Sequence, residues 1–211
     1  ADTLPILVET AVSHGAFVSV NPGIKQITTR FEAIRKMLAS ISLVAMNRLE
    51  AEAFVRQAVA ELSGSENAQL RHIAAASLHA PGEGAGRRRD VSAALVEGLL
   101  QLGAQRMLLT DGRHGSYYGH NGEIFFCPAL EVPVSSTVGA GDAFVSTFCA
   151  MTVAGETAPD ALRAAAVNSA SVVTRPDTQS GLLRRDSVIE QVQVLKAKLP
   201  VAHGHIHNWT A

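Results

Sequence analysis

The chain has little of what marks secreted, membrane-spanning or nucleic-acid-binding proteins. Its 211 residues include two cysteines, Cys127 and Cys149, too few for a disulfide framework and too far apart for a Cys-x-x-Cys metal pair. Charged residues make up 18% and no long apolar run is present, so we expect no membrane span. The net charge of -1 provides no general field for nucleic acid or an anionic membrane. Any anionic ligand must therefore be held by local geometry.

The cysteines and the N-terminal residues both favour a cytoplasmic protein. Unpaired cysteines suit a reducing compartment. The first fifteen residues do not resemble a secretory signal, because they lack a basic leader and because Asp2 and Glu9 interrupt their apolar pattern. Hydrophobic residues make up 47% of the sequence, enough for the core of one globular domain. We place that domain in residues 1–200 and a tail in residues 201–211.

The first part of the chain alternates strand patterns with helix patterns. Apolar residues recur at helical spacing over residues 4–12, 31–41 and 47–59, whereas "FVSV" at 17–20 and "SLVAM" at 42–46 are typical of short buried strands. This alternation predicts an α/β fold, in which parallel strands are joined by right-handed crossovers and covered by helices.

The remainder predicts loops, a hairpin and more helices. Residues 63–90 are mostly polar, with a helix around Leu70 and a solvated arginine run at 87–89, and Asp90 or Ser92 is placed to cap the next helix. A buried strand at 105–110 and a turn at 111–115 precede a hairpin at 116–126, whose Asn121-Gly122 pair fits a tight primed turn. Three helices follow. The tail carries His203, His205 and His207, which suggest either a metal site or an end without regular structure.

The stretch "TVGAGDAF", residues 137–144, combines a flexible turn, a helix start and one carboxylate. Gly139 and Gly141 let a ligand approach the backbone, and the first amides of a helix there would be unpaired and would attract an anion. A carboxylate beside such a site, Asp142, suggests a base that accepts the proton of an attacking hydroxyl. The alternative is structural: the glycines break the chain and Asp142 caps a helix. The stretch is neither a Walker loop nor a dinucleotide fingerprint.

The wider stretch "STVGAGDAFVSTFCA" resembles the C-terminal signature of the ribokinase-like (PfkB) family of sugar and nucleoside kinases, usually DTTGAGDAF. Three further segments resemble that family's elements in the family's order: "LVAMNRLEAEAF" at 43–54, "LLTDGRHGSYY" at 108–118 and "AAAVNSASVVTRPDTQSG" at 164–181. Four ordered elements are far more specific than one glycine-rich loop. The resemblance implies a three-layer α/β/α sandwich with a mostly parallel sheet and a hairpin.

The resemblance also implies a phosphotransferase that moves the γ-phosphoryl group of ATP to a hydroxyl of a sugar or nucleoside. Asp142 would be the general base, and the amides of Gly139, Ala140 and Gly141 would stabilise the transferring group. The residues implied on the nucleotide side are Thr110, Gly112, Gly115 and Asn168. On the magnesium and phosphate side they are Asn47 and Glu50, acting through water, although the spacing of this pair equally predicts a capping box at a helix start.

Two departures from the family pattern limit these expectations. Ser136 stands where relatives carry an aspartate associated with bound potassium, so we expect no monovalent-cation site. The family's first strands and lid sheet, which hold the acceptor and through which relatives often form homodimers, are not legible before residue 1. The chain is then a fragment of a longer kinase or a short relative, and the rival hypothesis is a non-catalytic nucleotide-binding or regulatory remnant. The run "SVNPG" at 19–23 leans slightly toward a nucleoside-like or uncommon acceptor.

Overall fold

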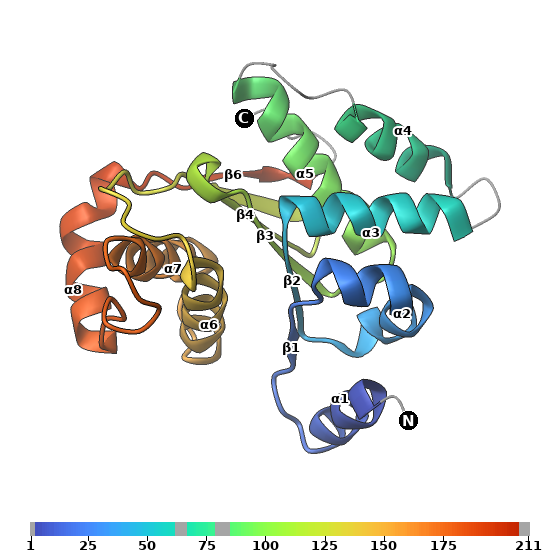
Figure 1. Ribbon diagram of the computed structural model, residues 1–211, viewed down its shortest axis with the longest axis horizontal. Coiled ribbons are helices and arrows are strands. Elements are labelled where there is room, and N and C mark those ends of the chain that lie inside the picture. The colour runs from blue at the N-terminus through green and yellow to red at the C-terminus, as the bar shows by residue number, and fades with distance from the viewer. Residues whose placement is uncertain (1–2, 62–66, 79–84, 207–211) are drawn as a thin grey trace. The chain divides into compact units, whose positions relative to one another are not determined.

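The computed structural model describes residues 3–61, 67–78 and 85–206. The helices within these ranges are α1 Thr3–Ser13, α2 Ile24–Met37, α3 Arg48–Glu61, α4 Asn67–Leu78, α5 Ala85–Gln101, α6 Ala140–Val153, α7 Ala158–Val173 and α8 Arg185–Leu195 (Figure 1). The strands are β1 Ser19–Val20, β2 Leu43–Asn47, β3 Arg106–Thr110, β4 Ser116–His120, β5 Glu123–Cys127 and β6 Ala202–His205. The predicted α/β alternation is confirmed.

The six strands form one mixed sheet in the order β1-β2-β3-β4-β5-β6. Strands β1 and β2 are parallel, with Ser19 opposite Leu43 and Val20 opposite Val44. A two-residue turn joins β4 to β5, and Asn121 and Gly122 have φ angles of 51° and 77°, as a primed hairpin turn requires. The hairpin predicted from the Asn-Gly pair is therefore confirmed.

The chain divides into two compact units, each described by itself below. The first comprises residues 1–109, 117–124 and 204–211, and the second comprises residues 110–116 and 125–203. The prediction of a single domain over residues 1–200 stays a prediction. None of the described helices is both long and apolar enough to cross a lipid bilayer.

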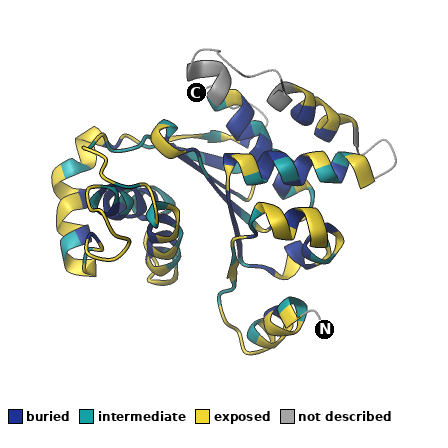
Figure 2. Cartoon of the chain, in the orientation of Figure 1, coloured by how far each residue is buried: buried dark blue, intermediate teal, exposed yellow. Residues whose placement is uncertain are grey.

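The core of the first unit lies around β2 and α3. The first four residues of β2 are almost fully buried, which explains their unbroken apolar run, typical of a central parallel strand (Figure 2). Helix α3 packs against β2, α2, α4 and α5. The rings of Phe31 and Phe54 lie 4.9 Å apart and join α2 to α3.

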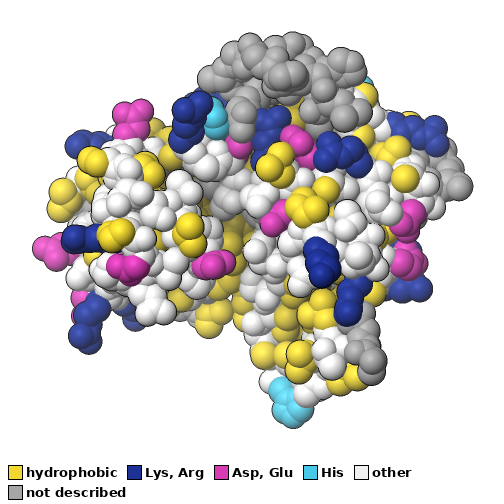
Figure 3. Space-filling model, in the orientation of Figure 1, with side chains coloured by type: hydrophobic (Ala, Val, Ile, Leu, Met, Phe, Trp, Pro, Cys, Tyr) yellow, Lys and Arg dark blue, Asp and Glu magenta, His cyan; other side chains and the backbone are white. Residues whose placement is uncertain are grey.

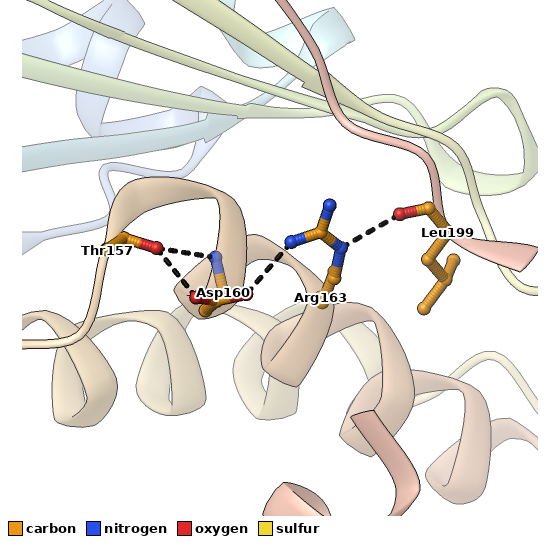
Figure 4. Close-up of polar contacts among 4 residues, drawn as sticks. All are labelled: Thr157, Asp160, Arg163 and Leu199. Carbon is orange, nitrogen blue, oxygen red and sulfur yellow. Dashed lines mark hydrogen bonds and ion pairs between the residues drawn. The ribbon is translucent and has the colours of Figure 1, made fainter. Parts of the chain in front are cut away.

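The second unit is built on the packing of α6 against α7 and of α7 against α8. Buried alanines on α7 allow close approach of the helices. Thr157 caps α7: its hydroxyl accepts the N–H of Asp160 at 3.3 Å and donates to the Asp160 carboxylate at 2.8 Å. Arg163 contacts that carboxylate at 2.9 Å and donates to the carbonyl oxygen of Leu199 at 3.0 Å, which ties the segment after α8 to α7 (Figure 4).

Two local predictions were wrong. Helix α5 begins at Ala85, so Asp90 and Ser92 lie within the helix and do not cap it. Arginine is a good helix former and the glycine at 86 costs little at the start of a helix of 17 residues, so the polar run continues the helix instead of forming a loop.

The start of the tail is likewise regular, because Ala202–His205 form β6 and the N–H of Ile206 donates to the carbonyl oxygen of Gly122 at 2.9 Å. The ring of His203 stacks on Phe125 with centroids 4.4 Å apart. This contact joins segments far apart in the sequence, so it could not be read from the sequence. No cluster of three metal-binding side chains occurs in the described part of the chain, and His207 lies outside it.

Candidate active site

The start of α6 carries the glycine motif and exposes unpaired backbone donors. Gly139 is the N-cap residue in the left-handed conformation, with φ 81°, and no side chain caps this helix end. The first helical hydrogen bond runs from the N–H of Ala143 to the carbonyl oxygen of Gly139 at 2.9 Å. Among the described residues, no acceptor contacts the N–H groups of Gly141 and Asp142. These two donors lie at the positive end of the helix, where anions are favoured.

The two glycines of the motif serve different purposes. Gly141 is exposed, and a Cβ added to it would meet no atom within 4 Å, so a ligand can approach the backbone there. A Cβ on Gly139 would instead lie 2.9 Å from Cβ and 3.0 Å from Cγ2 of Thr178. Gly139 is therefore required twice, by its positive φ and by the close approach of Thr178. The side chain of Asp142 belongs to the first turn and is exposed.

Helix α7 anchors the motif on both sides of Gly139. Before the motif, the carbonyl oxygen of Val173 accepts the N–H groups of Ser135 at 2.7 Å and Ser136 at 3.2 Å. Just after Gly139, the hydroxyl of Ser169 donates to the carbonyl oxygen of Ala140 at 3.0 Å. Residues 135–140 are thus held at both ends by hydrogen bonds to helix α7.

The segment between α7 and α8, residues 174–184, is called the braced loop here because hydrogen bonds hold its backbone. Its residue Thr178 lies beside Gly139. One carboxylate oxygen of Asp177 accepts the N–H groups of Gln179 at 2.9 Å and Ser180 at 2.7 Å, and the other accepts the Ser180 hydroxyl at 2.6 Å. The Ser180 hydroxyl and these two amides lower the pKa of Asp177 to about 2. A Cβ on Gly181 would lie 2.6 Å from the Cα atom of Val172, so this loop also packs closely on α7.

The predicted nucleotide residue Asn168 is 6% exposed and makes protein contacts at both ends of its amide. Its Nδ2 donates to the hydroxyl of Thr147 on α6 at 2.7 Å, and its Oδ1 accepts the N–H of Leu183 at 2.9 Å. These bonds join α7, α6 and the residue two places after Gly181. Asn168 therefore fixes the braced loop to the two helices that carry the motif.

Thr110, Gly112 and Gly115 belong to the second unit, with Thr110 at the end of β3 and the two glycines in the turn that follows it. The N–H of Asp111 donates to the carbonyl oxygen of Gly115 at 2.9 Å and so closes the turn. Gly112 is exposed with φ 53°, and a Cβ there would meet no atom within 4 Å. At Gly115, φ is 102° and a Cβ would lie 2.5 Å from the carbonyl oxygen of Cys127, so no other residue fits. Gly112 offers an open backbone, whereas Gly115 shapes the turn.

Asn47 and Glu50 lie in the first unit and form the capping box that their spacing predicted. The N–H of Glu50 donates to Asn47 Oδ1 at 2.9 Å, and the N–H of Asn47 donates to Glu50 Oε2 at 2.8 Å. The other carboxylate oxygen of Glu50 takes no part in the box. The capping role leaves room for a second role in which Glu50 acts through water.

Four residues that no sequence pattern predicted hold the motif or its neighbouring loop in place: Ser169, Val173, Asp177 and Thr178. The run Thr-Arg-Pro-Asp at 174–177 is a turn signal, but nothing in it indicates contact with residue 139. Charge does not mark the site either. On the face drawn in Figure 3, acidic and basic side chains are interspersed. With a net charge of -1, anion binding at α6 would depend on the amides and not on a general field.

Comparison with known proteins places these features in a family. The model of the pfkB family carbohydrate kinases matches residues 2–185. Similar curated proteins include acarbose 7(IV)-phosphotransferase of Actinoplanes, 35% identical over 104 residues, which are 47% of this chain and 35% of that protein. D-tagatose-1-phosphate kinase of Klebsiella oxytoca is 31% identical over 98 residues, 46% of this chain and 32% of that protein.

Among solved structures, Arabidopsis thaliana ribokinase complexed with ribose and ATP superposes with a TM-score of 0.66 at 20% identity. The match covers 92% of this chain and 53% of the ribokinase, and at this identity it shows the fold alone. The chain thus spans about a third of the length of these curated relatives and about half of the solved kinase. With the family model covering most of its length, the chain belongs to the pfkB family of carbohydrate kinases.

Proposed function

We propose that the whole protein is an ATP-dependent kinase that phosphorylates a hydroxyl of a carbohydrate. One observation carries the proposal: the start of α6 presents the free N–H groups of Gly141 and Asp142 next to an exposed carboxylate, with no side chain capping the helix. A γ-phosphoryl group would suit this arrangement in two ways. Its negative charge would be bound by the N–H groups, and the hydroxyl that attacks it must lose a proton, which the carboxylate could accept.

In the proposed reaction, Asp142 is the general base. Its carboxylate accepts the proton of the acceptor hydroxyl as that oxygen forms a bond to the γ-phosphorus. The bond between the γ-phosphorus and the bridging oxygen breaks, and ADP leaves with its electron pair. The amides of Gly139, Gly141 and Asp142 stabilise the charge on the phosphoryl oxygens during transfer, whereas the predicted amide of Ala140 already donates to the carbonyl oxygen of Thr137 at 3.4 Å.

The remaining predicted residues act on the nucleotide side. Thr110 offers a hydroxyl and Gly112 an open backbone turn to the nucleotide. Gly115 acts indirectly by shaping that turn, and Asn168 acts indirectly by joining α6, α7 and the loop after α7. Magnesium, when bound with ATP, neutralises phosphate charge. In this proposal the magnesium ion interacts with Asn47 and Glu50 through water molecules. The capping box occupies Asn47 Oδ1 and Glu50 Oε2, and Glu50 Oε1 remains for this role. Ser136 offers no charge for a monovalent cation, and its hydroxyl accepts the N–H of Val138 at 3.3 Å.

The acceptor we propose is a sugar, not a nucleoside. The curated relatives act on acarbose and on tagatose 1-phosphate by their names, and the solved relative holds ribose. The slight lean toward a nucleoside from residues 19–23 has no support among them. The second candidate function is a nucleotide-binding remnant without turnover, which Ser136, an uncharged residue at the aspartate position of the family pattern, favours.

The test has two arms on the full 211-residue chain. Isothermal titration measures the binding of MgATP, and a coupled assay measures ADP released with a panel of sugars and nucleosides as acceptors. The proposal predicts nucleotide binding and sugar-dependent ADP release that Asp142→Asn abolishes. Binding without turnover supports the remnant only when the natively complete gene product behaves in the same way. Absence of nucleotide binding contradicts both candidates.

A further inference from the structure

Thr178 packs against Gly139, a residue of the glycine motif to which helix α7 makes no hydrogen bond in the described part of the chain. Hydrogen bonds from α7 hold Ser135 and Ser136 before the motif and Ala140 within it. Gly139 lies between these points, in the left-handed conformation, with no side chain of its own to pack. The Cβ and Cγ2 atoms of Thr178 fill the space that a side chain of Gly139 would occupy. The contact with Thr178 therefore limits how far this glycine can move.

The loop that carries Thr178 is itself rigidly held, although its residues are exposed. Asp177 accepts three hydrogen bonds from the two residues that follow Thr178. On the C-terminal side, Gly181 packs on the backbone of Ser171 and Val172, and the Leu183 N–H is bound by Asn168. The backbone on both sides of Thr178 is thus held by hydrogen bonds and close packing.

We propose that Thr178 is a positioning residue that holds Gly139 and thereby aims the free N–H groups of Gly141 and Asp142 at the terminal phosphoryl group of the nucleotide. The inference rests on the proposed function of that site. The peptide units of residues 139–141 are directly linked, so a displacement of Gly139 redirects the N–H of Gly141. A hydrogen bond weakens steeply as its angle departs from linear, so loss of this aim would reduce affinity for the terminal phosphoryl group and not for the rest of the nucleotide.

The variants Thr178→Ala and Thr178→Val separate this role from others. Alanine removes the Cγ2 atom that contacts Gly139, whereas valine keeps a β-branched side chain of similar shape and removes only the hydroxyl. The first measurement is backbone order in the free protein, from the ¹⁵N heteronuclear NOE of residues 139–142. The second is the ratio of the Kd values for MgADP and for Mg·AMP-PNP, a non-hydrolysable analogue of ATP, in the full 211-residue chain.

For Thr178→Ala we expect a lower NOE at Gly139 and Gly141, an unchanged Kd for MgADP, and Mg·AMP-PNP binding weakened about tenfold, the order of one hydrogen bond to a charged group. Thr178→Val should match the wild type in both measurements. Two results would overturn the inference. One is that alanine leaves both the order and the ratio unchanged or weakens both ligands equally. The other is that valine loses as much as alanine, which would mean that the hydroxyl acts directly.

Failure of the proposed function gives a different result. If the wild type does not bind Mg·AMP-PNP more tightly than MgADP, the phosphoryl site itself is wrong. The NOE of the free protein does not depend on any ligand. It then still decides whether Thr178 orders Gly139, and an unchanged NOE in Thr178→Ala overturns that part as well.

Discussion

Helix α3 begins directly after strand β2 and helix α6 begins after a loop, and the first N–H groups of the two helices have opposite surroundings. At α3, the side chains of Asn47 and Glu50 satisfy each other's backbone N–H groups. At α6, Gly139 has no side chain to offer, and the N–H groups of Gly141 and Asp142 have no acceptor in the described part of the chain. Helix α7 resembles α3, since the hydroxyl of Thr157 accepts the N–H of Asp160.

The difference teaches where this protein can bind an anion through its backbone. At a capped helix start, the N–H groups already donate to the cap and cannot bind an anion. An uncapped start lowers the stability of the protein unless water or a ligand takes the place of the cap. The cost at α6 is retained together with a glycine in the left-handed conformation and a loop packed against it. We interpret this as stability given up for a phosphoryl site.

The largest expected effect comes from removing the proposed base, Asp142, at the uncapped start of α6, called the open start below. Asp142→Asn keeps the size of the side chain but cannot accept a proton, so the rate of phosphotransfer should fall by about 10²–10⁴. The affinity for MgADP and the free energy of unfolding should hardly change. The matched control is Asp186→Asn, an exposed acidic residue in the first turn of α8. Equal rates for wild type and Asp142→Asn would remove Asp142 from the mechanism.

The two glycines of the open start should respond differently to alanine. Gly139→Ala forces an L residue to a φ of 81° and into Thr178, so the free energy of unfolding should fall by about 1–3 kcal/mol. Gly141→Ala meets no atom within 4 Å and sits in a helix, so stability should be kept or raised slightly. Its methyl group should nevertheless weaken binding of an ATP analogue. Urea unfolding and isothermal titration test both variants, and equal loss of stability in the two would refute the distinction.

At the capped start of α3, two variants of Glu50 separate its capping role from its proposed role in magnesium binding. Glu50→Ala should lower the free energy of unfolding by about 1 kcal/mol, because the N–H of Asn47 loses its partner. Glu50→Gln keeps an oxygen for that bond, so its stability should stay close to that of the wild type. If the charge also acts on magnesium through water, Glu50→Gln should weaken nucleotide binding in the presence of Mg²⁺ and not in its absence. An unchanged Mg²⁺ dependence would leave Glu50 with the capping role alone.

The smallest effect should come from the closed start of α7, as a pH dependence. Burial raises the pKa of Asp160, but the hydrogen bonds from Thr157 and Arg163 outweigh it and lower the pKa below its ordinary value of 3.8. The ionised form therefore stabilises the folded protein above pH 3.8, and this contribution is lost as the pH falls through the lower folded pKa. Urea unfolding between pH 6 and pH 3 should show a smaller loss of stability for Asp160→Asn than for the wild type. A steeper loss in the variant would reverse the sign of this account.

Patterns within one segment of the sequence were enough to predict the elements and part of the site. The Asn-Gly turn, the capping box of Asn47 and Glu50 and the helix after Gly139 each depend on neighbouring residues, and each is present. What sequence reasoning missed depends on contacts between segments. The approach of Thr178 to Gly139 joins positions 39 residues apart, and β6 depends on Gly122 and Phe125, which no periodicity in the tail reveals. The start of α5 was missed for another reason, because glycine and arginine fit both a loop and a helix.

The most direct test of the open start of α6 is a ¹H–¹⁵N NMR titration of the protein with Mg·AMP-PNP. The account predicts large, saturable shifts of the Gly141 and Asp142 amide signals with the same Kd as isothermal titration, while the Thr157-capped amide of Asp160 stays in place. Saturation of binding without movement of the Gly141 and Asp142 signals would contradict it.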